Sequence, residues 1–240
     1  TFAFKEKKGS WEMKRPVPDS WTVVRTGLPL IARLTGFKHT GIFPEQSPNW
    51  AWLSERIKDF VSPDSQKDLR SPHILNLFGY TGAATVTAAL AGASITHVDA
   101  SKQSLDWAHE NARLSNIGED KIRWMLDDTL AFVKREARRG ASYDGIILDP
   151  PAFGRGAKGE VWKIEEDLPK LLETLKELLS DKSGSFFLLN GYAAGYAARS
   201  FAQAVESTFG EVSGESGELY IKESASDRVI PSGIYSRFVR

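Results

Sequence analysis

The sequence predicts an α/β fold with a doubly wound, mostly parallel sheet. From residue 73 onward, short apolar runs typical of buried strands alternate with longer segments of helical periodicity. Glycines follow the first of these runs, and an acidic residue follows each of the next three. Because the carboxyl ends of parallel strands meet at one edge of such a sheet, we expect these residues to lie together there. Five βα units and two closing strands would form an open sheet of about seven strands with helices on both faces.

The expected elements follow in order along the chain. Strands are predicted at residues 73–78, 94–99, 121–126, 144–149 and 184–190, and helices at residues 83–91, 101–115, 128–139, 165–180 and 196–208. Ser101 has a side chain suited to cap the second of these helices, whose apolar positions recur at helical spacing. Two closing strands, at residues 217–221 and 234–239, are expected to be antiparallel.

Residues 1–62 differ from the rest of the chain, since they hold four of the seven tryptophans and many prolines and glycines. They predict a small β-rich N-terminal extension with extended pieces at residues 21–25, 28–34 and 41–43, a turn at 44–48 and a connecting helix at 49–61. The polar composition of residues 63–72 is typical of a linker. We therefore expect an extension, a linker and a main domain at residues 73–240.

Composition bounds the kind of protein. Thirty-one basic residues balance 31 acidic residues, which argues mildly against a protein whose function depends on non-specific binding of phosphate groups. Cysteine is absent, so there is no disulfide framework, thiolate metal site or cysteine nucleophile, and we expect no metal.

No apolar run approaches the length of a membrane span and no signal peptide is recognisable, so we expect a soluble, cytoplasmic protein without a membrane partner. The sequence begins with Thr1 rather than Met, which is typical of a piece of a longer protein. Nothing in the composition predicts an oligomeric state.

The turn after the first strand predicts a cofactor site. It runs Gly79-Tyr80-Thr81-Gly82 and leads into a helix whose N-terminus offers free N–H groups. Asp99 lies 20 residues after Gly79, at the tip of the next strand, where an acid can hold two ribose hydroxyls. Asp127, Asp128 and Asp149 end the following two strands.

The form of this turn selects among nucleotide-like cofactors. It is not G-x-G-x-x-G, and no Walker lysine follows it. A diphosphate is cradled by several glycine N–H groups, so two glycines and a tyrosine suit a ligand with fewer phosphates. S-adenosylmethionine fits, with its amino-acid part against residues 76–82, its ribose against Asp99 and its adenine amine against Asp127 or Asp128.

The fourth strand leads into Asp149-Pro150-Pro151-Ala152-Phe153. The two prolines stiffen the loop, so the carboxylate and the loop carbonyls would point to one place. Phe153 would add a ring face, and stacking of one base is worth about 1–3 kcal/mol. The loop therefore suits a planar nitrogenous substrate. The alternative is an ordinary rigid loop with Phe153 packed in the core.

Four segments in this order resemble a known family. They are Asn-Leu-Phe-Gly-Tyr-Thr-Gly at 76–82, His-Val-Asp-Ala-Ser at 97–101, Leu-Asp-Asp-Thr at 126–129 and Ile-Leu-Asp-Pro-Pro-Ala-Phe at 147–153. The chain resembles a class I S-adenosylmethionine-dependent methyltransferase. More narrowly, it resembles the bacterial large-subunit ribosomal RNA methyltransferases that carry an F-x-Y-T-G turn and a D-P-P-x-F loop. The resemblance implies a Rossmann-like seven-stranded methyltransferase sheet and a ribosomal RNA substrate.

By position, the resemblance also implies site residues. Cofactor contacts would come from Phe78, Gly79, Tyr80, Thr81, Gly82, Asp99, Ser101, Asp127, Asp128 and Asp149, with Gln46 closing over the cofactor. Asp149, Pro150 and Phe153 would face the target base, and Lys163 matches a lysine that follows the loop in the family. The alternative for Lys163 is a solvated charge at the start of a helix.

One departure from the family limits the chemistry. Members that methylate carbon 5 of cytosine use a cysteine after the fifth strand, where this chain has residues 189–195 without one. We therefore expect direct transfer to a nitrogen, which needs no nucleophile on the protein and depends mainly on alignment. A ring nitrogen with a free lone pair needs no base, whereas an exocyclic amine would be polarised by Asp149. Ala152 separates the aromatic residue from the second proline, unlike the usual exocyclic-amine loop.

Three other functions remain open. A methyltransferase for a protein or small molecule is favoured slightly by the neutral charge, and it would be disfavoured by an exposed cluster of Arg135, Arg138, Arg139, Arg155, Lys158 and Lys163. A non-catalytic module would bind the cofactor and position RNA or a partner. A dinucleotide oxidoreductase is disfavoured by the form of the glycine turn.

Overall fold

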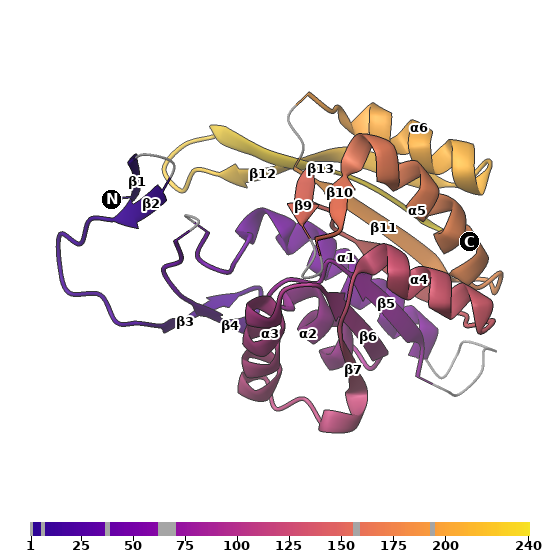
Figure 1. Cartoon of the computed structure of the whole chain (residues 1–240), viewed down its shortest axis with the longest axis horizontal. Coiled ribbons are helices and arrows are strands. Elements are labelled where there is room, and N and C mark those ends of the chain that lie inside the picture. The colour runs from indigo at the N-terminus through magenta and orange to yellow at the C-terminus, as the bar shows by residue number, and fades with distance from the viewer. Residues whose placement is uncertain (1, 6–7, 37–38, 62–70, 156–158, 193–194) are drawn as a thin grey trace.

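The computed structural model in Figure 1 describes residues 2–5, 8–36, 39–61, 71–155, 159–192 and 195–240. Its central sheet contains β5 (His73–Leu77), β6 (Ser94–Asp99), β7 (Ile122–Leu126), β8 (Gly145–Leu148), β11 (Phe186–Gly191), β12 (Gly214–Lys222) and β13 (Val229–Val239). The strand order is β12-β13-β11-β8-β5-β6-β7. The pairs from β7 to β11 are parallel, and β13 is antiparallel to both neighbours. The predicted α/β class and seven-stranded sheet are confirmed.

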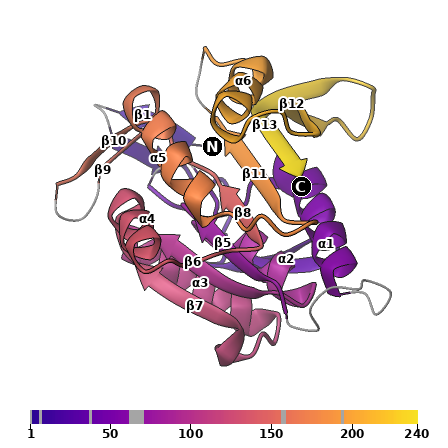
Figure 2. The ribbon, with the colours of Figure 1, turned by 90° about the vertical axis from the view of Figure 1, so that its right-hand side faces the viewer.

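Six helices among the described residues cover the two faces of the sheet. They are α1 (Ser47–Val61), α2 (Ala83–Leu90), α3 (Lys102–Leu114), α4 (Thr129–Arg138), α5 (Ile164–Leu178) and α6 (Ala198–Phe209). Figure 2 shows α4, α5 and α6 on one side of the sheet and α1, α2 and α3 on the other. No helix in the described part of the chain combines the length and the apolar character that a membrane crossing requires.

The strands are apolar at successive positions because both faces of the sheet are buried. Side chains alternate between faces, so Leu75 and Leu77 pack with α4, α5 and α6, whereas Ile74 packs with α1 and α2. On β8, Leu148 and Ile147 divide between the same two cores. The strands that carry the site therefore hold a fixed register, since a slip by one residue would exchange the two faces.

The N-terminal extension contains two antiparallel hairpins. β3 (Trp21–Arg25) pairs with β4 (Leu28–Ala32) as predicted, whereas the pair β1 (Phe2–Lys5) and β2 (Lys8–Trp11) was not predicted. The extended piece predicted at residues 41–43 is wrong: Gly41 has φ 91° and packs directly against the ring of Trp107. A short 3-10 helix, Pro44–Gln46, leads into α1, which begins two residues earlier than predicted. Most of the predicted linker, residues 63–70, lies outside the described residues.

A small hairpin that the sequence does not predict follows the D-P-P-x-F loop. β9 (Phe153–Arg155) and β10 (Val161–Lys163) pair in antiparallel fashion, apart from the main sheet. Each strand has only three residues, which is too short for an alternating pattern to stand out. One face of the hairpin is closed, because Trp162 is buried and Gly154 packs against Pro151 and Trp162.

Candidate functional site

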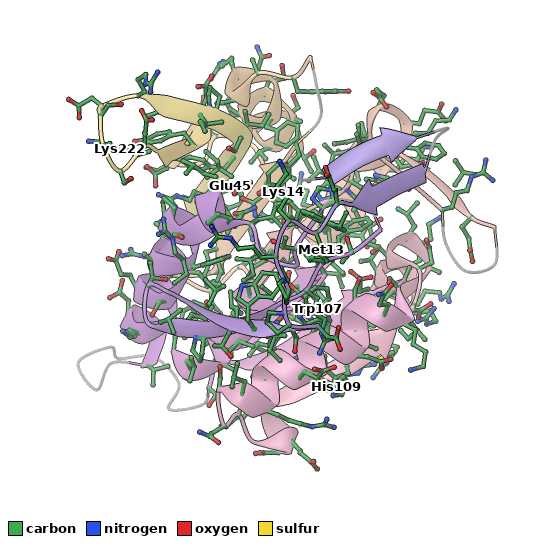
Figure 3. The ribbon with its side chains drawn as sticks, turned by 90° about the vertical axis from the view of Figure 1, so that its left-hand side faces the viewer. Met13, Lys14, Glu45, Trp107, His109 and Lys222 are labelled. Atoms are coloured by element: carbon green, nitrogen blue, oxygen red, sulfur yellow. The ribbon has the colours of Figure 1, made fainter. Side chains whose placement is uncertain are left out.

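The glycine turn lies at the carboxyl end of β5, between β6 and β8. This is where the order of strands reverses, the usual ligand-binding crevice of an open α/β sheet. Figure 3 views the molecule from the side on which Glu45 lies near the centre, with Trp107 and His109 of α3 below it. The segment that carries Met13 and Lys14 appears in the same central part of the view.

The two glycines of the turn are required by packing. A Cβ atom at Gly79 would clash with the ring of His97, and a Cβ atom at Gly82 would crowd Ala108. The φ angle of Gly82 itself is 82°, which also favours glycine. The neighbours Phe78 and Tyr80 have left-handed backbones, with φ 54° and 48°. The sequence explained these glycines by approach to a ligand; the structure adds that β6 and α3 already leave no room for a side chain.

Asp99 ties the turn to the start of α3. Its Oδ2 accepts from the backbone N–H of Tyr80 at 2.8 Å, and its Oδ1 accepts from the N–H of Ser101 at 2.8 Å. Burial raises the pKa of Asp99, and the two backbone donors oppose that rise. Ser101 caps α3 as predicted, because its Oγ accepts from the N–H of Ser104 at 3.2 Å. Each carboxylate oxygen of Asp99 keeps a lone pair for a further donor.

Asp127 and Asp128 point in different directions. Asp127 forms an ion pair with Arg135 of α4 and lines neither of the two cavities described next. Asp128 caps α4 through Oδ1, which accepts from the N–H of Ala131 at 2.9 Å, and it lines the larger cavity described next. Of the two adenine contacts suggested by the sequence, the geometry therefore favours Asp128.

Two cavities meet at this edge of the sheet. The outer cavity has a volume of about 610 Å³, and the inner one, beside the glycine turn, about 50 Å³. Both are lined by Phe43, Phe78, Tyr80 and Asp149. Among the predicted site residues, one cavity or the other is lined by Gln46, Phe78, Gly79, Tyr80, Thr81, Gly82, Asp99, Ser101, Asp128, Asp149 and Pro150.

Asp149 is the carboxylate shared by the two cavities. The Nε2 of Gln46 lies 3.3 Å from its Oδ2 and donates to it. The same Nε2 donates to the hydroxyl of Tyr192 at 2.8 Å. Burial raises the pKa of Asp149 to about 7, and the charge of nearby Glu45 adds to the rise. Asp149 therefore changes its protonation state near neutral pH, unlike an exposed aspartate.

The proline loop after Asp149 is anchored by the hairpin. The indole Nε1 of Trp162 donates to the carbonyl of Pro151 at 2.6 Å, and the N–H of Ile164 donates to the carbonyl of Ala152 at 3.1 Å. The Trp162 ring also packs against Phe78, with 5.0 Å between ring centroids. The hairpin thus joins the proline loop to the glycine turn, and it holds both walls of the outer cavity in place.

Phe153 and Lys163 are not brought together with the other predicted residues. Phe153 is 55% exposed, neither in the core nor on a cavity wall, and the guanidinium of Arg155 lies 5.9 Å from its ring centre. Lys163 is exposed and its Nζ pairs with Glu166 at 2.7 Å. Both side chains lie opposite each other in the register of β9 and β10, on the outer face of the hairpin.

Sequence reasoning missed three aromatic residues of the outer cavity: Phe43, Trp162 and Tyr192. The ring of Phe43 packs against Tyr192 at 5.3 Å and Tyr80 at 5.7 Å, so three distant segments form one aromatic wall. Tyr192 follows directly after β11, so the strand-end rule that selected Asp99 and Asp149 would also have selected it. Nothing local in the sequence marks Phe43 or Trp162.

The described residues contain no group of three or more His, Asp or Glu side chains arranged to hold a metal ion. The acids of this edge are instead spread along it, each bonded to backbone or to another side chain. What the edge offers is a set of hydrogen-bonding groups facing a cavity with aromatic walls.

Comparison with known proteins identifies similar chains. Residues 5–207 match a family model described as S-adenosylmethionine-dependent methyltransferase. The crystal structure of a SAM-dependent methyltransferase from Agrobacterium tumefaciens is 36% identical, with a TM-score of 0.90 over 99% of this chain and 76% of that one. The structure of SMU.776, described as a methyltransferase and solved in complex with SAH, has a TM-score of 0.72 at 23% identity, over 96% of this chain and 59% of that one.

Among curated relatives, the ribosomal RNA large subunit methyltransferase K/L of Pseudoalteromonas translucida is 33% identical over 190 residues. The match covers 78% of this chain and 25% of that protein. The chain spans between a fifth and a quarter of the length of the curated relatives that it matches. The comparisons therefore concern one part of those relatives.

Proposed function

Because this chain belongs to the S-adenosylmethionine-dependent methyltransferase family, as its sequence predicts, we propose that it methylates a base nitrogen of RNA by direct transfer. One observation carries the proposal: the inner and outer cavities share Asp149, so one carboxylate borders both the glycine turn and the proline loop. A cofactor held at the turn and an acceptor held at the loop would meet there.

The residues of the glycine-turn side fit the cofactor. The free lone pairs of Asp99 suit two ribose hydroxyls, and the carboxylate of Asp128 suits an adenine amine. We assign the backbone of residues 78–82 and the side chain of Ser101 to the same role. The outer cavity is lined by Asp99, Ser101 and Asp128 as well as by the proline loop, and its volume of about 610 Å³ is that of an ordinary small-molecule site. The bound cofactor would supply an activated methyl group on a sulfonium.

The residues of the proline-loop side fit a planar nitrogen acceptor. The acceptor nitrogen would use its lone pair to take the methyl group from the sulfonium that the bound cofactor supplies, and it would then lose a proton if it carried one. Asp149 is placed to hold that N–H and to take the proton, because its pKa near 7 leaves it partly ionised at neutral pH. The chain has no cysteine, so the covalent route to carbon 5 is closed to it.

An RNA acceptor is supported by the names of the curated relatives, which are ribosomal RNA large subunit methyltransferases. The outer face of the β9–β10 hairpin adds a physical argument, since it presents an exposed ring, Phe153, beside the cations Arg155 and Lys163. We assign Phe153 and Lys163 to the nucleotides next to the target, because they lie off the wall of the outer cavity, whereas Arg155 also lines that cavity. A cytoplasmic location remains the prediction made from the sequence.

A protein or small molecule is the second candidate acceptor, favoured by one observation about charge. Arg135 pairs with Asp127, Arg139 with Glu136, and Lys163 with Glu166. These pairs neutralise much of the basic cluster that would attract RNA, while Lys158 lies outside the described residues.

The test is methyl transfer from labelled S-adenosylmethionine to total RNA and, in parallel, to a protein fraction. We expect label in RNA, its loss in Asp149→Ala, and unchanged cofactor affinity in that variant by calorimetry. Asp181→Ala, at an exposed position that pairs with Arg240, serves as the matched control and should transfer normally. Label in the protein fraction alone would refute the RNA acceptor. If Asp149→Ala lost cofactor affinity as well as methyl transfer, the assignment of Asp149 to the acceptor rather than to the cofactor would be refuted.

A further inference from the structure

Three segments far apart in the sequence converge on Asp149. The 3-10 helix before α1 brings Gln46, the end of β8 leads to Asp149, and the end of β11 leads to Tyr192. The Nε2 of Gln46 donates to the Tyr192 hydroxyl at 2.8 Å and to Asp149 Oδ2 at 3.3 Å. Gln46 is only 4% exposed, so water does not replace these partners easily.

The orientation of the Gln46 amide follows from a chain of buried hydrogen bonds that starts at Arg237. A guanidinium only donates, so the atom of Asn49 that lies 2.7 Å from Arg237 must be its carbonyl Oδ1. The Nδ2 of Asn49 therefore faces the other way, and it donates to Asn190 Oδ1 at 2.7 Å and to Gln46 Oε1 at 3.4 Å. That fixes Gln46 with its NH₂ group toward Tyr192 and Asp149.

This orientation leaves one donor and one acceptor at the cavity. The Tyr192 oxygen accepts from Gln46, so its own hydrogen points elsewhere, and no described residue accepts it. Asp149 Oδ2 is engaged by Gln46, whereas no described residue donates to Oδ1. Both side chains line the outer cavity. The packing of Phe43 against the Tyr192 ring holds the hydroxyl in this place.

We propose that Tyr192 contacts the methyl acceptor by donating its hydroxyl hydrogen, while Gln46 is a positioning residue that holds Tyr192 and Asp149 side by side. The acceptor class that matches is a planar edge with an N–H next to a carbonyl oxygen or a ring nitrogen. Asp149 Oδ1 accepts the N–H, and Tyr192 donates to the neighbouring lone pair. This inference rests on the proposed function, and it moves Gln46 from the cofactor to the acceptor side.

The first experiment needs no substrate. The carboxyl pKa of Asp149 is measured by NMR in the ligand-free protein and in Gln46→Leu, with Gln103→Leu on the exposed side of α3 as the control. Glu45, His39 and Tyr192 are the titratable groups nearby. Loss of a donor to the carboxylate should raise the pKa of Asp149 by about one unit. An unchanged value in Gln46→Leu would overturn the positioning role.

The second experiment compares Tyr192→Phe, which keeps the ring, with Tyr220→Phe at an exposed position of β12. Transfer is measured on whichever fraction, RNA or protein, the unaltered protein labels. We expect kcat/KM to fall about tenfold in Tyr192→Phe with cofactor affinity unchanged, and no change in Tyr220→Phe. Activity of Tyr192→Phe equal to that of the unaltered protein would overturn the substrate contact. Label in protein instead of RNA would refute the RNA acceptor while this comparison still decides the role of Tyr192.

Discussion

Gly79 shows how one residue serves both the sheet and the site. Its Cα lies against the fully buried ring of His97. The Nδ1 of that ring forms a hydrogen bond of 2.8 Å with the hydroxyl of Thr85. Burial lowers the pKa of His97 to about 3, so the ring stays neutral at physiological pH. The bend of the glycine turn is thus set from below by β6, before any ligand contributes.

Gly79→Ala should therefore destabilise the fold itself. The added Cβ would overlap the His97 ring, and overpacking of this kind costs about 1–3 kcal/mol. Urea denaturation measures the difference, with Gly36→Ala as the control, because open space surrounds Gly36. Equal urea midpoints for Gly79→Ala and the unaltered protein would show that the turn accommodates the added methyl group without a clash.

Asp149 links stability to pH. Its pKa of about 7 lies above the value near 3.8 expected in the unfolded chain, so the native state holds the extra proton between these values. Its contribution to the unfolding free energy is full below pH 4, falls as pH rises from 4 to 7, and is constant above that. At pH 8 the buried, ionised carboxylate is a cost to folding.

Asp149→Asn should remove this cost. We expect the variant to be more stable than the unaltered protein at pH 8 by on the order of 2 kcal/mol, and about equal at pH 4. Urea titrations at the two pH values provide the measurement, and Asp19→Asn at an exposed position should show no such difference. A gain of the same size at both pH values would argue that shape, not charge, is responsible.

At the scale of elements, the β9–β10 hairpin has two different faces. The inner face, with Trp162 and Gly154, closes on the proline loop, and the outer face exposes Phe153 and Lys163. Since Trp162 anchors the loop through Pro151, the outer side chains can change without disturbing the cavity. One face of the hairpin thus fixes the geometry of the proline loop, and the other face is free to contact a partner outside the cavity.

Phe153→Ala should weaken RNA binding without affecting the cofactor. Loss of one stacked base is worth about 1–3 kcal/mol, or roughly 5- to 150-fold in affinity. Filter binding with ribosomal RNA fragments measures it, Phe153→Trp should restore affinity, and Leu90→Ala on the exposed side of α2 is the control. If Phe153→Ala binds RNA normally, the outer face of the hairpin is not part of the RNA surface.

At the scale of the whole molecule, the N-terminal extension and the sheet share one core. Leu53 and Ile57 of α1 are fully buried in the cluster that contains Ile74 and Val86. The hydrogen bond from Arg237 of β13 to Asn49 of α1 joins the two ends of the chain. Gln46 reaches the site because α1 is held in this way.

The division into an extension and a main domain is tested by residues 73–240 alone. Because the fragment would expose the apolar surface that α1 covers, we expect it to unfold at lower urea concentration than the whole chain and to bind cofactor more weakly. Urea denaturation and calorimetry provide the readouts. A fragment as stable as the whole chain would support an independent domain at residues 73–240.

The sequence by itself determined the α/β class, the order of the elements and the acids at the strand ends. These depend on local signals: side-chain periodicity, glycine turns and the residue that follows each apolar run. Only the tertiary structure decided which strand-end groups share a cavity. It turned Asp127 toward Arg135, left Phe153 and Lys163 outside, and brought Tyr192 to Asp149. The resemblance placed Gln46 at the cofactor, but its hydrogen bond to Asp149 spans 103 positions of sequence, and such contacts arise from packing between distant segments that no local pattern encodes.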